Sequence, residues 1–147
     1  RAEGLSERVR VVAGDRAVRT WRAHAAAPAW PGPPVWVHGD PHPMNLLLHS
    51  DGTLAGVIDF GDVCSGDPAS DLAVAWLMFD ADAREAFRAA CSLSGAYDSA
   101  VWARAWAWAL GLASVFALAS DDMPALAAIA RHGLAQTLGD PEFSAAG

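Results

Sequence analysis

Two short acidic motifs carry the residue types in this sequence that could do chemistry. Residues 38–45 read His-Gly-Asp-Pro-His-Pro-Met-Asn, and residues 58–61 read Ile-Asp-Phe-Gly. Within them, Asp40, Asn45 and Asp59 place two carboxylates and one carboxamide beside short apolar runs. Hard oxygen atoms of this kind hold Mg²⁺, and a carboxylate can also orient an attacking hydroxyl group. The two motifs therefore predict phosphoryl-transfer chemistry.

The spacing of these residues suggests a role for each. Asp40 and Asn45 have the spacing of the kinase catalytic loop, His-x-Asp-x-x-x-x-Asn. In that loop the aspartate accepts a hydrogen bond from the substrate hydroxyl, and the asparagine oxygen binds a metal. The main work of such an aspartate is orientation, because the attacking oxygen loses its proton late in a loose transition state. Asp59 ends a predicted hairpin that would return it toward Asn45 and a shared Mg²⁺ ion, and Asp62 is a further candidate ligand.

The same loop allows a different metal. His38, Asp40 and His42 alternate along the chain, so on an extended strand they would share a face and could ligate zinc. Pro41 and Pro43 oppose this arrangement, because proline breaks the hydrogen-bond ladder of a strand. The remaining histidines are scattered and do not supply a third or fourth ligand. A zinc-dependent hydrolase is therefore the less favoured alternative.

The composition indicates one compact domain and limits the classes of partner that it could bind. The chain has 147 residues, of which 53% are hydrophobic and 18% charged, enough to bury roughly 70% of the unfolded surface in a single core. Its formal net charge is −7 and its arginines form no basic run, so we expect no nucleic-acid partner and favour a cationic ligand. Cys64 and Cys91 lack the spacing of a metal site or a disulfide framework, so we expect a cytoplasmic location.

The motifs need a scaffold, and the sequence predicts a helix-dominated α+β domain around them. Apolar residues recur at helical steps in residues 15–27, and prolines then stiffen the chain before a strand expected at residues 35–37. Asp-Gly is a turn signal between two apolar runs that predict a β-hairpin, residues 46–48 and 54–58. Asp67 is the expected N-cap of the next helix. Helices are expected over residues 69–79, 83–93, 99–119 and from 123 or 124 to 138.

The long helix expected over residues 99–119 has an aromatic stripe. Aromatic and small residues recur there at helical steps, which is typical of core packing. They are Trp102, Trp106, Ala109 and Ala113, with Trp108 and Phe116 on neighbouring faces. Some of these rings could instead wall a substrate pocket, where cation–π contact would favour an aminated ligand. The apolar run over residues 105–119 falls short of the roughly 20 residues that a bilayer crossing needs, so we expect a buried helix and no membrane partner.

Three segments together resemble a known family. Residues 38–46, residues 57–62 (Val-Ile-Asp-Phe-Gly-Asp) and residues 66–73 (Gly-Asp-Pro-Ala-Ser-Asp-Leu-Ala) are similar to the motifs of the aminoglycoside phosphotransferase and choline kinase-like family. The resemblance implies the carboxy-terminal lobe of a protein-kinase-like fold, with a short β-hairpin carrying the catalytic and metal-binding loops. It also implies transfer of the γ-phosphoryl group of ATP to a hydroxyl of a small molecule, with Mg²⁺ as cofactor. Aminoglycosides, other amino alcohols and sugars are the acceptor classes that follow.

The resemblance also assigns roles to single residues. By it, Asp40 is the catalytic base, and Asn45 and Asp59 are the magnesium ligands. His38 would support the catalytic loop through packing and hydrogen bonds rather than react, and Asp71 would brace the backbone of that loop. The residues alone leave a second role open for Asp71, which could simply complement a helix dipole. The sequence departs from the family at position 44, where it has methionine and glycine is common.

The lobe that covers the nucleotide has no counterpart in this sequence. Kinases of this kind grip the ATP phosphates with a lysine, and the chain contains none. It also begins with arginine rather than methionine. We therefore expect residues 1–147 to be a single domain, the catalytic lobe of a truncated phosphotransferase, with weak or absent activity in isolation. The alternative is a non-catalytic kinase-like remnant that acts as a binding module. The phosphate acceptor and the oligomeric state stay open.

Overall fold

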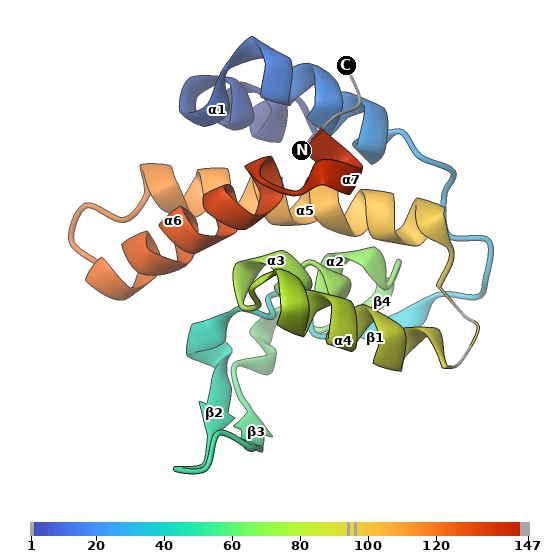
Figure 1. Cartoon of the computed structure of the whole chain (residues 1–147), viewed down its shortest axis with the longest axis vertical. Helices are drawn as coiled ribbons and strands as arrows, with labels where there is room; N and C mark the ends of the chain where they lie inside the picture. The colour runs from blue at the N-terminus through green and yellow to red at the C-terminus, as the bar shows by residue number, and fades with distance from the viewer. Residues whose placement is uncertain (1, 94, 96, 145–147) are drawn as a thin grey trace.

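The computed structural model describes residues 2–93, 95 and 97–144 and forms layered helices with two small sheets. Figure 1 shows α1 (Ala2–Ala25) above α5 (Ser99–Leu118) and α6 (Pro124–Leu138), with the strands and three shorter helices beneath them. A β-hairpin projects from the lower end of the molecule (Figure 1). The predicted helix-dominated α+β class is confirmed.

The first helix begins well before the one predicted over residues 15–27. Gly14 divides α1, with φ 82° and ψ 177°, and the predicted helix corresponds to the part that starts at Asp15. Glycine adopts a positive φ without steric cost, which explains why a helix-start signal lies at a kink inside a longer helical segment. The first part was not predicted because its charged residues obscure the apolar face, on which Val9 is fully buried.

The core forms around α5, which packs against α1, α6 and the short helix α2 (Ala69–Leu72). The aromatic stripe is confirmed as core at Trp102 and Trp106, which are 3% and 1% exposed, whereas Trp108 is 39% exposed. Trp106 donates its indole N–H to the carbonyl oxygen of Thr137 at 3.0 Å and so ties α5 to α6. α5 is long and apolar enough to cross a membrane, but 67% of its apolar window is buried inside the structure, as expected for a core helix.

Two antiparallel two-stranded sheets hold the loops that carry the acidic motifs. The predicted strand is β1 (Val35–Val37), and it pairs with β4 (Cys64–Gly66), which was not predicted. The sequence Cys-Ser-Gly has little intrinsic strand preference, so this pairing depends on tertiary contacts. β2 (Leu46–Leu48) and β3 (Leu54–Val57) form the predicted hairpin.

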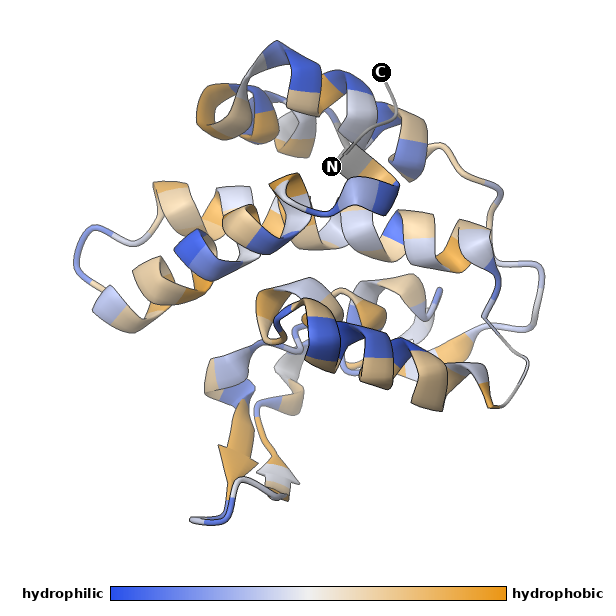
Figure 2. Cartoon of the chain, in the orientation of Figure 1, coloured by the Kyte–Doolittle hydropathy of each residue, from blue (hydrophilic) through white to orange (hydrophobic). Residues whose placement is uncertain are grey.

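The hairpin is apolar on its outer surface. Figure 2 shows hydrophobic residues along both of its strands, away from the helical body. Leu47, Leu48 and Leu54 are exposed there. The hairpin therefore depends on its backbone pairing and turn for its shape more than on burial in the core.

The prediction of one helix over residues 69–79 is wrong. The chain instead forms two short helices, α2 and α3 (Val74–Leu77), with Ala73 between them. Trp76 donates its N–H to the carbonyl oxygen of Ala73 at 3.1 Å, a three-residue step that tightens the turn at this junction. The helices predicted over residues 83–93, 99–119 and 123 or 124 to 138 are confirmed as α4 (Ala81–Ser92), α5 and α6. The short α7 (Pro141–Ser144) was not predicted.

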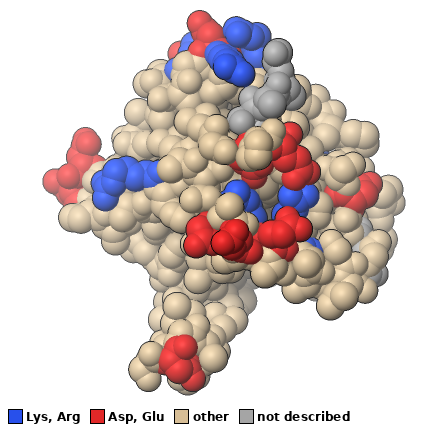
Figure 3. Space-filling model, viewed as in Figure 1, with Lys and Arg blue, Asp and Glu red and all other residues tan. Residues whose placement is uncertain are grey.

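Ion pairs and a hydrogen bond attach the last helix to the domain. Figure 3 shows acidic and basic side chains interleaved on the face formed by α4 and α7. On this face Arg88 pairs with Glu142 at 2.6 Å, and Arg84 lies 3.4 Å from the buried carboxylate of Asp140. The indole N–H of Trp76 donates to the same Asp140 carboxylate at 2.8 Å. These contacts connect α3, α4 and α7.

Candidate active site

The loop between β1 and β2 contains the first acidic motif, and His38 ties it to the second. Its Nε2 lies 2.8 Å from the carbonyl oxygen of Ile58, and its Nδ1 lies 3.3 Å from the backbone nitrogen of Asp40. Nε2 carries the proton, because a backbone N–H can only donate and a carbonyl oxygen can only accept. The ring of Phe60 packs against the His38 ring at 4.9 Å. His38 thus makes the packing and hydrogen-bond contacts expected of a loop-supporting residue.

Asp71 reaches from α2 to the backbone of the same loop. Its Oδ2 accepts a hydrogen bond from the N–H of His38 at 2.7 Å, and its Oδ1 accepts one from the N–H of Gly39 at 3.0 Å. Hydrogen bonds to an ionised carboxylate are stronger than those between neutral groups. Of the two roles left open for Asp71, these contacts match the brace, and its contribution to catalysis stays a prediction.

Asp40 and Asn45 lie side by side. Asn45 is 6% exposed, and its Nδ2 donates to the backbone oxygen of Asp40 at 2.9 Å and lies 3.5 Å from Asp40 Oδ2. Asp40 Oδ1 accepts no hydrogen bond from any residue that the structure describes, and the side chain is 32% exposed. One oxygen of this partly exposed carboxylate is therefore held, while the other has no hydrogen-bond partner among the described residues and is left to orient a hydroxyl group.

His42, which the sequence suggested only as a zinc ligand, also contacts the candidate site. Its Nδ1 lies 3.3 Å from the backbone nitrogen of Met44 and accepts its N–H. Its Nε2 lies 3.3 Å from Asp40 Oδ2 and 3.4 Å from Asn45 Nδ2. The ring packs edge-on against Phe116 of α5 at 5.5 Å. His42 therefore links the proposed base to the helical core, a contact that its position two residues after Asp40 could have suggested.

Asp59 lies where the hairpin returns to the catalytic loop. Ile58 donates its N–H to the carbonyl oxygen of Asn45 at 3.0 Å. This hydrogen bond places the backbone of Asp59, the next residue, close to that of Asn45. Asp59 has φ 61° and ψ 65°, and it is the one non-glycine residue with a positive φ in the described part of the chain. Strain of this kind is typical of functional positions. Its carboxylate does not cap the 3-10 turn Phe60–Asp62 that follows.

The two motif loops touch at Gly39 and Asp62. Gly39 has φ 90°, and a Cβ at this position would overlap the carbonyl oxygen of Asp62. Glycine is therefore required here both for the backbone conformation and for the close approach. Asp62 contributes its backbone to this packing, and its side chain lines a cavity rather than a hydrogen-bonded cluster.

The kinds of oxygen atom that Asn45 and Asp59 carry are those that magnesium prefers. Asn45 turns its Nδ2 toward Asp40, which leaves its Oδ1 for a cation, and Asp59 offers a carboxylate. Mg²⁺ is usually bound by one or two protein oxygens of this kind, with water and phosphate oxygens in the other positions. Among residues 2–93, 95 and 97–144, no three His, Cys, Asp or Glu side chains come together to hold a metal ion. The zinc alternative thus lacks a ligand set in this part of the chain.

An ion pair joins the third motif segment to α5. Arg104 donates from Nε to Asp67 Oδ2 at 2.7 Å and from Nη2 to Asp67 Oδ1 at 3.2 Å, and it also donates to the carbonyl oxygen of Pro28. Asp67 Oδ1 accepts the N–H of Ala69 at 3.0 Å, which is the capping contact predicted for this residue. The role of Arg104 was not predicted, because the neighbouring residues of its helix do not indicate that this arginine is buried and pairs with a distant loop.

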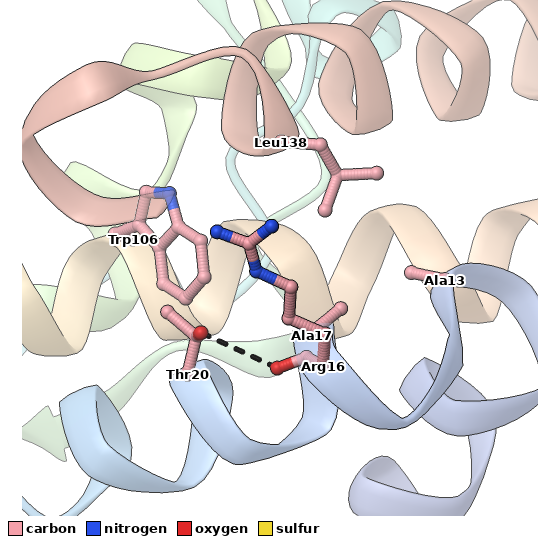
Figure 4. A pocket seen from close by; sticks show the side chains of 6 residues that line it. All are labelled: Ala13, Arg16, Ala17, Thr20, Trp106 and Leu138. Atoms are coloured by element: carbon pink, nitrogen blue, oxygen red, sulfur yellow. Dashed lines mark hydrogen bonds between the residues drawn. The ribbon is translucent and has the colours of Figure 1, made fainter. Parts of the chain in front are cut away.

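A cavity of about 640 Å³ opens beside the catalytic loop. It is lined by residues of α1, of both motif loops, of β4 and of α5, among them Leu5, Arg8, Gly39, Asp62, Cys64 and Trp108. A second cavity, of about 300 Å³, lies between α1, α5 and the end of α6, where Figure 4 shows the side chain of Arg16 extending toward Trp106 and Leu138. The second cavity contains none of the motif residues.

Comparison with known proteins defines the class to which this fold and site belong. The model of the phosphotransferase enzyme family, APH, matches residues 2–111, and the chain belongs to this family. The match includes both acidic motifs and Asp71, and it confirms the predicted resemblance. Membership implies phosphotransferase activity in general and a protein-kinase-like fold.

One relative among curated proteins is itself without an assigned activity. It is the uncharacterized protein YcbJ of Bacillus subtilis (strain 168), which is 34% identical over 50 residues. The aligned segment covers 34% of this chain and 16% of the length of YcbJ. No solved structure gives a significant match to the chain.

Proposed function

We propose that this chain is the catalytic lobe of an ATP- and Mg²⁺-dependent phosphotransferase that moves the γ-phosphoryl group to a hydroxyl of a small molecule. The observation that carries the proposal is the pairing of Asp40 with Asn45, which leaves one oxygen of a partly exposed carboxylate without a hydrogen-bond partner among the described residues. In this proposal the lysine that grips the nucleotide is supplied by chain outside this sequence, which contains no lysine. We also propose a cytoplasmic location, because the number and spacing of the two cysteines do not suggest a disulfide framework.

The proposed step is a direct phosphoryl transfer. Asp40 Oδ1 accepts a hydrogen bond from the acceptor hydroxyl and orients its oxygen for in-line attack on the γ-phosphorus of ATP. A bond forms between that oxygen and phosphorus, the bond from phosphorus to the β-phosphate oxygen breaks, and the hydroxyl proton passes to Asp40. The contacts of Oδ2 with Asn45 Nδ2 and His42 Nε2 set the direction in which Oδ1 points.

Asn45 Oδ1 and Asp59 would hold Mg²⁺, which when bound neutralises charge on the transferring phosphates. The chain keeps these two residues in register through backbone and side-chain bonds. Ile58 donates to the backbone of Asn45, and His38 donates to the backbone of Ile58. His38 therefore acts as a positioning residue for the metal ligands as well as for the loop.

The proposal is tested by separating metal binding from turnover. Mn²⁺ binding is measured by electron paramagnetic resonance, and ADP formation is measured with Mg²⁺, ATP and a panel of hydroxylated amines, sugars and hydroxy acids. Both are recorded for this chain and for the longest gene product that contains it. Asp59→Asn should weaken Mn²⁺ binding at least about tenfold, because loss of even an outer partner of a metal ligand typically costs 10- to 100-fold and Asp59 is proposed as a ligand itself. Asp40→Asn should leave Mn²⁺ binding unchanged and lower turnover at least about 100-fold.

Asp82→Asn is the matched control, since Asp82 is exposed in the first turn of α4, away from both motifs. It should change neither readout. Unchanged turnover in both Asp40→Asn and Asp59→Asn would refute the site assignment. An absence of Mn²⁺ binding and turnover in every form would favour the non-catalytic binding module instead.

A further inference from the structure

The cavity beside the catalytic loop determines what kind of acceptor fits, an inference that rests on the proposed function. Its volume of about 640 Å³ lies within the range of small-molecule sites. Gly39 forms part of its wall and directly precedes Asp40, the proposed base. This end of the cavity is therefore where an acceptor hydroxyl would be presented.

A large part of the wall is apolar and rigidly built. Leu5 of α1, Val37 of β1 and Trp108 of α5 line the cavity, and Trp108 is exposed although its neighbours Ala107 and Ala109 are buried. The Leu5 methyl carbons lie 3.6 and 3.8 Å from the place of a Cβ on Gly111, so α1 is docked closely on α5. An exposed indole on a packed helix is suited to stack against a flat apolar group.

The charges in the wall cancel rather than accumulate. Arg8 and Asp62 form no ion pair with any residue that the structure describes, whereas Asp67 is already paired with Arg104. A polycation would meet one unpaired carboxylate and, in the same wall, the like charge of Arg8. The net charge of −7 that favours a cationic ligand is thus not shared by this cavity.

We propose that the phosphate acceptor is an alcohol with a mainly apolar body and a single acidic group. The body packs against Trp108 and Leu5, the acidic group pairs with Arg8, and the hydroxyl lies at the end of the cavity formed by Gly39. Aminoglycosides are then poor acceptors, because most of their ammonium groups would lose hydration without gaining a carboxylate partner. The transfer step is the one described above and requires no co-reactant besides ATP.

Cys64 is a built-in reporter for this cavity. It is exposed and lines the wall, whereas Cys91 lies in α4, outside the cavity lining. Burial raises the pKa of the Cys91 thiol, so this residue reacts slowly and serves as an internal reference. Alkylation by iodoacetamide is followed at both thiols by peptide mass spectrometry in the absence of nucleotide. The probes are mandelate, the neutral benzyl alcohol, the amine phenylglycinol and the polycation kanamycin.

Mandelate should slow the alkylation of Cys64 and leave Cys91 unaffected. It should act at about fivefold lower concentration than benzyl alcohol, the factor for one partly exposed ion pair. Arg8→Glu should remove this advantage and transfer it to phenylglycinol, while Arg19→Glu, an exposed position on the same helix, should not. Trp108→Ala should weaken protection by all three aryl probes, and Trp108→Phe should largely preserve it.

Stronger protection by kanamycin than by mandelate, no protection by mandelate, or the same probe preference in the parent and Arg8→Glu would each overturn the acceptor proposal. These outcomes leave the proposed function untouched, because the assay contains no ATP. A full loss of turnover in Asp40→Asn without mandelate protection would reject the acceptor class alone. Protection by mandelate combined with undiminished turnover in Asp40→Asn would reject the assigned catalytic role of Asp40 alone.

Discussion

The carboxylate of Asp71 lies 2.7 Å from the backbone nitrogen of His38, across a sequence separation that joins the third motif segment to the first. Its other oxygen accepts the N–H of Gly39, so one side chain satisfies two consecutive donors of the catalytic loop. The conformation of the loop before Asp40 therefore depends on a helix residue that follows both sheets.

Asp71→Asn should lower the free energy of unfolding by about 1–3 kcal/mol, because an amide cannot accept both N–H groups and leaves one donor unsatisfied. Urea denaturation measures this loss. Asp82→Asn, an equal change at an exposed position, should stay within about 0.5 kcal/mol of the parent. Equal midpoints for the two variants would show that the brace does not stabilise the loop.

Gly39→Ala should lower the free energy of unfolding by more than the positive φ at this position explains. Gly52 has a φ of 84° with open space around it, so Gly52→Ala should cost about 1 kcal/mol from backbone conformation. Gly39→Ala should cost at least about 1 kcal/mol more, because its Cβ would overlap the carbonyl oxygen of Asp62 and separate the two motif loops. Urea denaturation of both variants checks this, and similar losses would mean that the close approach can relax without cost.

The ion pair between Arg104 and Asp67 should be strongly coupled. Arg104 is buried, and its guanidinium bonds both oxygens of a half-buried carboxylate. A double-mutant cycle with Arg104→Met and Asp67→Asn should give a coupling of about 1–3 kcal/mol. Each single change leaves the other partner without its bonds, so the double variant should be less damaged than the sum. Additive losses would show that the two side chains act independently.

The stability of the hairpin turn should depend on pH through the carboxyl group of Asp51. Thr53 donates its hydroxyl to Asp51 Oδ1 at 2.7 Å and its N–H at 3.0 Å, and the side-chain bond is the main cause that lowers the pKa of Asp51. Because the pKa is lower in the folded state, the stabilisation is present above the ordinary carboxyl pKa of about 4 and is lost as pH falls through the folded value.

Thr53→Val should return the pKa of Asp51 toward its ordinary value, whereas Thr53→Ser keeps the hydroxyl and should preserve the lowered pKa. Carbon-detected NMR titration of the Asp51 carboxyl measures both. A titration curve that does not move in Thr53→Val would assign the lowered pKa to the backbone bond instead of the hydroxyl.

Local signals identified most of the elements in this chain. The strand at Val35–Val37, the hairpin and three of the later helices follow from apolar periodicity, proline positions and an Asp-Gly turn, all of which act over a few residues. The elements that were missed, β4 and α7, are short and lack strong propensity. The break at Ala73 was missed because the alanine and leucine residues around it favour a helix and no glycine or proline marks an interruption.

The sequence alone determined the residue types and spacing of the catalytic loop, because a five-residue step between Asp40 and Asn45 is a property of the chain and limits how far their side chains can separate. Tertiary structure decided which groups hold them: the contact of His42 with Asp40, the hydrogen bonds from Asp71 and the approach of Asp62 to Gly39. It also decided the composition of the cavity wall, where Arg8 of α1 and Trp108 of α5 come together. Such contacts join residues far apart in the chain, and their formation depends on packing that no short segment encodes.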